Sequence, residues 1–176
     1  MGVLEKSANF RKYRSMDILT LGDEQLRQKA EAIAVIGPEY KKIAAQMLEL
    51  LREGKGIGLA GPQVGLMKRI FVVKIDKDIP RVFINPSILE TSQEQSKVEE
   101  GCLSIPGFWA DVIRPERIKL QAWNEKGKPF TLEGDGLLAR VILHELDHLE
   151  GILFIDRLSE QKRKKILAQY EKRKQA

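Results

Sequence analysis

Residues 143–149 read Leu-His-Glu-Leu-Asp-His-Leu, an H-E-x-x-H pattern inside a run whose apolar residues repeat at helical spacing. Side chains four residues apart on a helix lie on one face, so His144 and His148 can bind the same metal ion. Glu145 follows the first histidine and can exchange a proton with water on that ion. The chain has no other histidine, and chance would produce this arrangement roughly once in 10³ such chains. The stretch therefore predicts a metal-binding helix.

Length and composition indicate one globular domain. The chain has 176 residues, of which 43% are hydrophobic and 31% charged, with a net charge of +5. It lacks a run of about 18 apolar residues, so we expect no membrane-spanning segment. Residues 1–15 carry basic side chains but no apolar core, which argues against a secretory signal. A single cysteine forbids an internal disulfide and suits a cytoplasmic protein.

Turn residues and apolar periodicity divide the chain into helices and short strands. Helices are predicted at 24–30, 38–53, 137–150 and 159–174, and strands at 69–75, 81–85, 88–89, 111–113, 118–123 and 130–132. Pro86 is expected to end the second strand. We expect residues 1–15 to form a mobile extension and residues 16–176 to form one domain. The predicted fold class is α+β, with mostly antiparallel strands packed around the central metal-binding helix and a C-terminal helix.

Residues 54–65 contain five glycines in twelve positions, which predicts a bent backbone in place of a packed regular element. A phosphate loop would end in Lys-Ser or Lys-Thr, and a dinucleotide fingerprint would lie between a strand and a following helix. Neither pattern is present, because here a helix precedes the glycines and a strand follows. Gln63 offers an amide donor that suits an oxyanion. A purely structural bend is the alternative interpretation.

A catalytic metal site needs a third protein ligand, and Cys102 is the remaining soft side chain. It lies in residues 99–107, which we expect to be bent by flanking Gly and Pro. A lone cysteine is more often a small buried hydrophobe. Carboxylates at Glu150 and Asp156 are alternative ligands. Asp147 should point away from the metal on helical geometry and brace a ligand or a loop.

Three motifs in order resemble the peptide deformylase family, and the similarity covers residues 16–155. The motifs are Gly56-Ile57-Gly58-Leu59-Ala60-Gly61-Pro62-Gln63, then Glu100-Gly101-Cys102-Leu103-Ser104, then His144-Glu145-Leu146-Asp147-His148. The resemblance implies metal-dependent hydrolysis of the N-terminal formyl group of N-formylmethionyl nascent peptides, with release of formate. It also implies that a metal-bound hydroxide attacks the formyl carbon while Glu145 acts as general base and then general acid.

The resemblance assigns the remaining roles. Cys102, His144 and His148 would bind one divalent ion, with Fe²⁺ as the physiological metal and Zn²⁺, Ni²⁺ or Co²⁺ as alternatives. The Gln63 amide and the Leu103 backbone N–H would stabilise the oxyanion. The substrate would lie as an added strand along Ile57, Gly58 and Gly101, with its methionine near Leu137 and Val141.

This chain departs from the family pattern at three positions. Gly61 replaces an alanine, which we expect to loosen the first motif. Leu143 stands where glutamine is common. Arg140 stands where an apolar residue is common, and we expect its stem to line the methionine pocket while its guanidinium reaches solvent.

Other functions share some of these features. A zinc endopeptidase would have the same helix motif, a Cys102 nucleophile would need only one histidine, and a structural metal site would need four protein ligands. The basic tail from Lys162 to Lys174 has two interpretations as well. It is either a solvated helix face or a segment that docks on ribosomal RNA.

Overall fold

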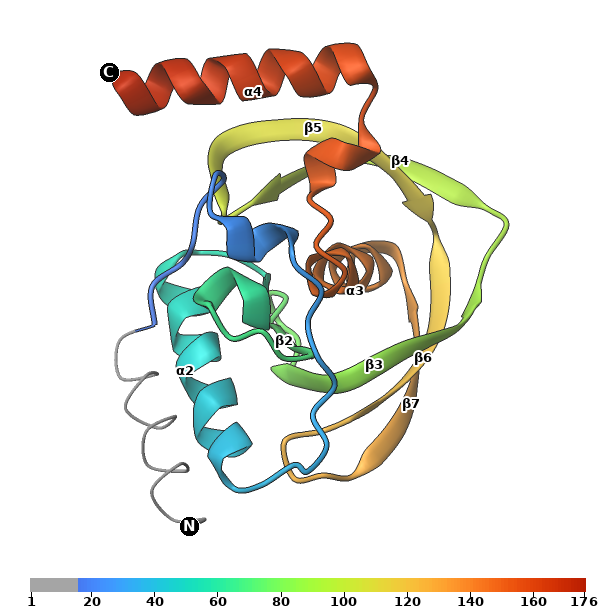
Figure 1. The fold of residues 1–176 in the computed structure, drawn as a ribbon. Coiled ribbons are helices and arrows are strands. Elements are labelled where there is room, and N and C mark those ends of the chain that lie inside the picture. The colour runs from blue at the N-terminus through green and yellow to red at the C-terminus, as the bar shows by residue number, and fades with distance from the viewer. Residues whose placement is uncertain (1–15) are drawn as a thin grey trace.

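The computed structural model describes residues 16–176, so the predicted N-terminal extension, residues 1–15, lies outside the described part. Helix α3 (Gly136–Leu149) is at the centre of the fold, and Figure 1 shows it end-on with strands curving around it. Helix α2 (Glu39–Glu53) covers one side of the sheet, and α4 (Glu160–Gln175) lies across β5 at the periphery. The predicted fold class is confirmed.

Every strand pair in the described region is antiparallel. One sheet has the order β1-β2-β3-β6-β7, and a separate two-stranded sheet is formed by β4 and β5. The strands of the larger sheet are β1 (Gly58–Ala60), β2 (Ile70–Val73), β3 (Arg81–Thr91), β6 (Arg117–Trp123) and β7 (Pro129–Asp135). Strands β4 (Gln95–Cys102) and β5 (Ile105–Pro115) join through a tight turn. The bend expected over residues 99–107 includes the turn at Leu103 and Ser104, a register shift between Gly101 and Cys102, and a positive φ of 82° at Gly107.

The apolar run in β2 explains how the sheet supports helices on both faces. Successive side chains of a strand point to opposite faces. Phe71 and Val73 face the core beneath α3, whereas Ile70 and Val72 face the core beneath α2. All four are at most 1% exposed. Strand β2 therefore packs against α3 on one face and against α2 on the other.

Pro86 does not end a strand, and the two strands predicted at 81–85 and 88–89 are one. The register of β3 against β6 shifts between Ile84 and Ser87, which marks a bulge. Asn85 has a positive φ of 48° there, and its side-chain amide exchanges two hydrogen bonds of 2.8 Å with the backbone of Ile33. A proline is tolerated at a bulge because the ladder is already interrupted.

The glycine-rich stretch contains regular structure, contrary to the prediction. Residues 58–60 form strand β1, in which Leu59 pairs with Val72 of β2. Strand β1 is first in the sheet order and is therefore an edge strand. The 3₁₀-helix η2 (Gly61–Val64) follows it. A β-carbon on Gly61 would lie 2.6 Å from the Leu66 carbonyl oxygen and 2.7 Å from that of Lys68. Glycine at 61 thus permits close packing, and the expectation of a loosened loop is wrong.

The predicted helices form at shifted boundaries. The first is the 3₁₀-helix η1 (Glu24–Arg27), capped by the Asp23 side chain, and it ends early because Gln28 is extended. Helix α2 buries Ile43, Met47 and Leu51. The 3₁₀-helix η3 (Phe154–Arg157) connects α3 to α4, and Ser159 caps α4.

Candidate metal centre and substrate cleft

Three soft ligand atoms converge beside α3. The ligand atoms of Cys102, His144 and His148 all lie within 4.8 Å of one another. Cys102 Sγ is 3.3 Å from His148 Nε2, and the two imidazole rings are 5.1 Å apart between centroids. Cys102 ends β4, so the sheet delivers the thiol to the helix. One thiol and two imidazoles suit a divalent ion with an open coordination position.

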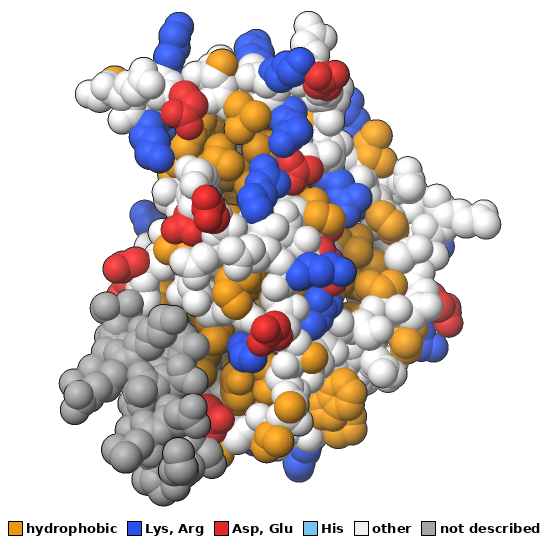
Figure 2. Space-filling model, viewed as in Figure 1, with side chains coloured by type: hydrophobic (Ala, Val, Ile, Leu, Met, Phe, Trp, Pro, Cys, Tyr) orange, Lys and Arg blue, Asp and Glu red, His pale blue; other side chains and the backbone are white. Residues whose placement is uncertain are grey.

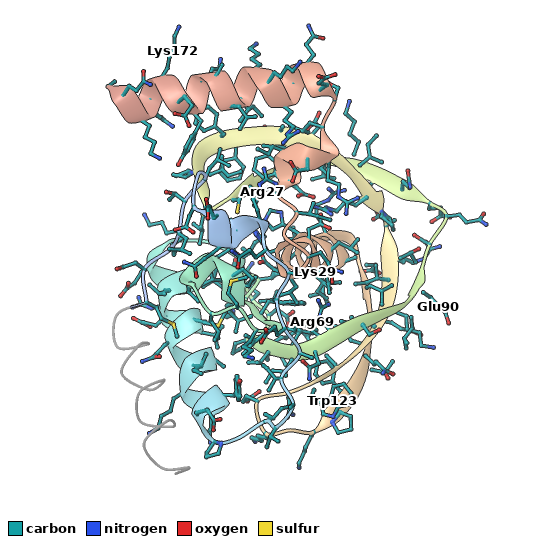
Figure 3. The ribbon with its side chains drawn as sticks, viewed as in Figure 1. Arg27, Lys29, Arg69, Glu90, Trp123 and Lys172 are labelled. Carbon is teal, nitrogen blue, oxygen red and sulfur yellow. The ribbon has the colours of Figure 1, made fainter. Side chains whose placement is uncertain are left out.

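The alternative carboxylate ligands lie elsewhere. Glu150 forms ion pairs with Arg69 and Lys29, which Figure 3 shows beside the end of α3. Asp156 pairs with Arg27 and Arg163. Both carboxylates are therefore engaged in surface ion pairs away from the thiol and the imidazoles.

The two histidines have opposite proton affinities. Burial lowers the pKa of His148 well below its usual value, assisted by the positive charge of His144, so this imidazole is neutral. Burial also acts on His144, but hydrogen bonds to Cys102 and Glu100 raise its pKa well above its usual value. A metal ligand must be deprotonated, so metal binding would displace a proton from this site.

Glu145 is held beside the two imidazoles in a nearly dry environment. It is 2% exposed, and burial raises the pKa of its carboxyl to about 7, against the opposing effect of His144. Its Oε2 atom has no hydrogen-bond partner among residues 16–176. A β-carbon on Gly58 would collide with Oε1, so glycine lets β1 approach the carboxylate. A buried carboxyl that titrates near neutrality can both accept and donate a proton.

Behind His144 lies a buried ion-pair network that the sequence analysis missed. Glu100 Oε2 is 3.0 Å from His144 Nδ1, and the Glu100 carboxylate accepts hydrogen bonds from Arg114 at 2.6 and 3.0 Å. Burial opposes the charged form, but the hydrogen bonds from His144 and Arg114 lower the pKa of Glu100 to about 2. Glu100 therefore stays ionised and orients the ring so that Nε2 is free for a metal.

The same network corrects one expectation and agrees with another. Arg140 is only 5% exposed, and its guanidinium donates to Glu100, the Val112 carbonyl and Ser96, so it does not reach solvent. Asp147 points away from the ligand atoms, as helical geometry predicts, and binds Arg114 at 2.9 Å and Arg157 at 2.6 Å. Leu143 lines a second cavity on the far side of α3 and does not contribute to the metal centre.

Both ends of the Gln63 amide have hydrogen-bond partners within the protein. Its Oε1 accepts from the Ala60 N–H at 2.9 Å, and its Nε2 donates to Ser104 Oγ at 3.1 Å. Nε2 also lies 3.5 Å from Cys102 Sγ. The side chain is 1% exposed, so the amide is fixed directly behind the thiol. Leu103 follows Cys102 in the turn, and its side chain packs near Gly54 and Gly56.

A cleft of about 500 Å³ opens over the two catalytic-motif residues His144 and Glu145. Its lining includes all five residues that the resemblance assigned to substrate binding, namely Ile57, Gly58, Gly101, Leu137 and Val141. It also includes Phe108 and Trp109, which the sequence analysis did not single out. A β-carbon on Gly101 would collide with the indole of Trp109, which is 64% exposed. The cleft thus has an apolar wall and an aromatic rim.

Among residues 16–176, every helix is too short or too polar to cross a bilayer.

Comparisons with known proteins agree with this geometry. The family model described as polypeptide deformylase matches residues 15–164. A peptide deformylase of Neisseria meningitidis serogroup B is 46% identical over 160 residues, covering 90% of this chain and 95% of the relative. The crystal structure of a Synechococcus elongatus peptide deformylase in complex with actinonin has a TM-score of 0.84 at 42% identity, covering 88% of this chain and 86% of that one. The Thermus thermophilus peptide deformylase has a TM-score of 0.84 at 40% identity, covering 89% of this chain and 93% of that one.

Proposed function

Because the chain belongs to the peptide deformylase family, we propose that Cys102, His144 and His148 hold the divalent metal ion on which its reaction depends. The reaction is hydrolysis of the N-terminal formyl group of N-formylmethionyl nascent peptides, which releases formate. The convergence of the three ligand atoms beside the cleft, which Cys102 and His144 line, carries this assignment. When bound, the metal supplies Lewis acidity and lowers the pKa of its water toward ~7.

Glu145 moves the protons in this proposal. Its buried carboxyl, with a pKa of about 7, can take a proton from the attacking water and return it to the departing amine nitrogen. The unpartnered Oε2 atom leaves one oxygen available for this transfer. Glu100 supports the step indirectly, since it holds the neighbouring His144 ring in one orientation.

Gln63 and the Leu103 backbone N–H would stabilise the developing oxyanion. The Gln63 amide nitrogen would exchange its 3.5 Å contact with Cys102 Sγ for the reacting oxygen and keep its bond to Ser104. We expect Gln63→Leu to lower kcat by about 10²–10³ and to retain the metal. A loss of metal at unchanged kcat per bound ion would instead assign Gln63 to holding the thiol.

The substrate would extend the sheets. Strand β1 is at the edge of the five-stranded sheet, and β4 pairs with β5 alone, so each has an edge available for an added strand. Ile57, Gly58 and Gly101 all line the cleft. An extended peptide between them would place its methionine side chain against the apolar helix residues Leu137 and Val141.

The decisive experiment measures metal content and formate release on one set of proteins. We expect wild-type protein to bind one ion per chain, with Fe²⁺ most active and Zn²⁺, Ni²⁺ and Co²⁺ as substitutes, and to release formate from formyl-Met-Ala-Ala. Cys102→Ala should lose both the metal and the activity. Activity in metal-free protein would favour a Cys102 nucleophile. Cleavage of internal peptide bonds without formate release would favour an endopeptidase, and bound metal without either activity a structural site.

We also propose that residues 16–176 act as one cytoplasmic catalytic domain whose α4 docks on ribosomal RNA. The exposed cations Lys162, Lys165 and Lys172 support this, and Figures 2 and 3 show basic side chains projecting from α4, with Lys172 directed away from β5. Replacing the three lysines with glutamine should weaken co-sedimentation with ribosomes and reduce its salt dependence. Co-sedimentation unchanged by these substitutions would leave α4 as a solvated helix.

A further inference from the structure

The inner face of α4 packs on the structure that forms the cleft. Ile166 and Tyr170 are 9% and 7% exposed, and they belong to a core cluster that includes Ile105 and Phe154. Cys102 and Phe108 pack against the same cluster. The Tyr170 ring lies 5.8 Å from the Phe108 ring between centroids. The helix is therefore in contact with one wall of the cleft.

Arg173 contacts that wall at three consecutive residues. Its guanidinium carbon lies 5.5 Å from the centroid of the Phe108 ring, a cation–π distance. Its Nη1 donates to the Pro106 carbonyl oxygen at 3.3 Å. A β-carbon on Gly107, whose φ is +82°, would collide with the same nitrogen. One side chain thus fixes both the backbone and the aromatic ring of residues 106–108.

Residues 106–108 lie at the outer part of the cleft. Pro106, Gly107 and Phe108 all line it, and Pro106 and Gly107 are exposed. In contrast, His144 and Glu145 are buried at its floor. The formyl-methionyl end of a peptide must reach the floor, so the residues that follow methionine pass the outer wall.

We propose that Arg173 is a positioning residue that holds the 106–108 wall against the residues following methionine in the substrate. The inference deepens the proposed function, because it takes the cleft as the peptide-binding site. Without the guanidinium, the wall keeps its covalent path through β5, but the Gly107 hinge and the Phe108 ring gain freedom. The loss should therefore weaken binding of longer peptides and leave the reaction at the buried floor unchanged.

The test compares two substrates, formyl-methionine amide and formyl-Met-Ala-Ala, on matched variants. In Arg173→Ala we expect KM for the tripeptide to rise roughly two- to tenfold while kcat is unchanged. A rise of this size corresponds to the loss of an exposed cation–π contact and one hydrogen bond. Kinetics on formyl-methionine amide should stay within error. Arg173→Lys should restore part of the tripeptide KM, because it keeps the charge and a donor but lacks the planar guanidinium.

Two control variants test whether a change in KM arises from a loss of charge or from a change in α4, and not from the contact with the wall. Lys41→Ala removes the same charge from an exposed site on α2, and Gln161→Ala alters an exposed site on α4, and neither should change KM. In a Phe108→Leu background the effect of Arg173→Ala should shrink, because the two residues act through one contact. Equal KM values for Arg173→Ala and Lys41→Ala would overturn the inference, as would an equal loss with both substrates.

A cleft variant distinguishes failure of this inference from failure of the proposed site. Trp109→Ala removes an aromatic side chain from the same outer wall. A raised tripeptide KM in Trp109→Ala, with none in Arg173→Ala, would overturn only the role of Arg173. An unchanged KM in both variants would show that the peptide does not use this cleft wall, and would overturn the substrate site with it.

Discussion

Helices α3 and α4 are of similar length but are held in different ways. Nine of the fourteen residues of α3 are buried, including Arg140, His144, Glu145 and His148, whereas α4 buries only Ile166 and Tyr170 among its sixteen. Arg140, His144 and Asp147 of α3 are bound by a buried network from β4 and β5. The polar side chains of α4 are mostly exposed. The candidate metal centre thus lies on the helix whose side chains are most restricted, whereas most side chains of α4 are open to solvent.

The largest effect should follow from changing the reactive group of α3 without changing its shape. Glu145→Gln is expected to lower kcat by about 10²–10⁴ and to keep the metal, because the amide fills the same space but cannot accept the proton. Kinetics and metal analysis on the same preparation test this. Near-normal turnover, or loss of the metal, would contradict the catalytic role.

Breaking the network behind α3 should cost stability more than breaking a surface ion pair. Arg114→Met leaves Glu100 and Asp147 with fewer partners in a buried site, so we expect the free energy of unfolding to fall by about 3–5 kcal/mol. Arg117→Met, which removes the exposed pair with Glu94, should cost less than about 1 kcal/mol. Urea unfolding of both variants measures the difference. Equal losses would show that the buried network is no more important to stability than the surface pair.

The same network should make the stability of the protein depend on pH under acidic conditions. The pKa of Glu100 is about 2 in the folded protein, below its usual value of 4.5. A lowered folded-state pKa contributes stability above the unfolded-state pKa, and this contribution is lost as pH falls from about 4.5 toward 2. We expect the metal-free wild type to lose more stability over this window than metal-free Glu100→Gln. Parallel pH profiles for the two proteins would show that Glu100 does not cause the loss of stability in acid.

The smallest effect should come from the outer face of α4. Replacing Lys162, Lys165 and Lys172 with glutamine should change the free energy of unfolding by no more than about 0.5 kcal/mol at each position, because these side chains are exposed. A thermal melt of the triple variant tests this. A large drop in Tm would show that these cations stabilise the fold. Weaker ribosome binding by the variant would then follow from lost stability as well as from lost contacts.

Part of the candidate site could be predicted because its information is local. The spacing of His144 and His148 on one helix follows from helical periodicity, and Cys102 was the only soft side chain left to join them. Glu145 lies beside the ligand for the same reason. The strands at 118–123 and 130–132 were recognised from alternation and a turn, and they form β6 and β7 with longer ends.

Other features could not be predicted because they depend on close approach between distant segments. Pro86 is a strand breaker by propensity, but the Asn85 bulge lets one strand continue through it. The sequence around Gly61 does not indicate that the carbonyl groups of Leu66 and Lys68 approach it closely. Arg173 reads as one more cation in a basic tail, yet its guanidinium lies over Phe108.

By itself, the sequence determined the helix with the two histidines, the chemistry of the candidate ligands and the family. Only the tertiary structure decided which charged residues serve that helix. Glu100 and His144 are 44 positions apart, Arg114 and Asp147 are 33 apart, and both pairs meet because β4 and β5 pack against α3. Helical spacing is a property of neighbouring residues, whereas a buried ion pair requires two segments to exclude water together.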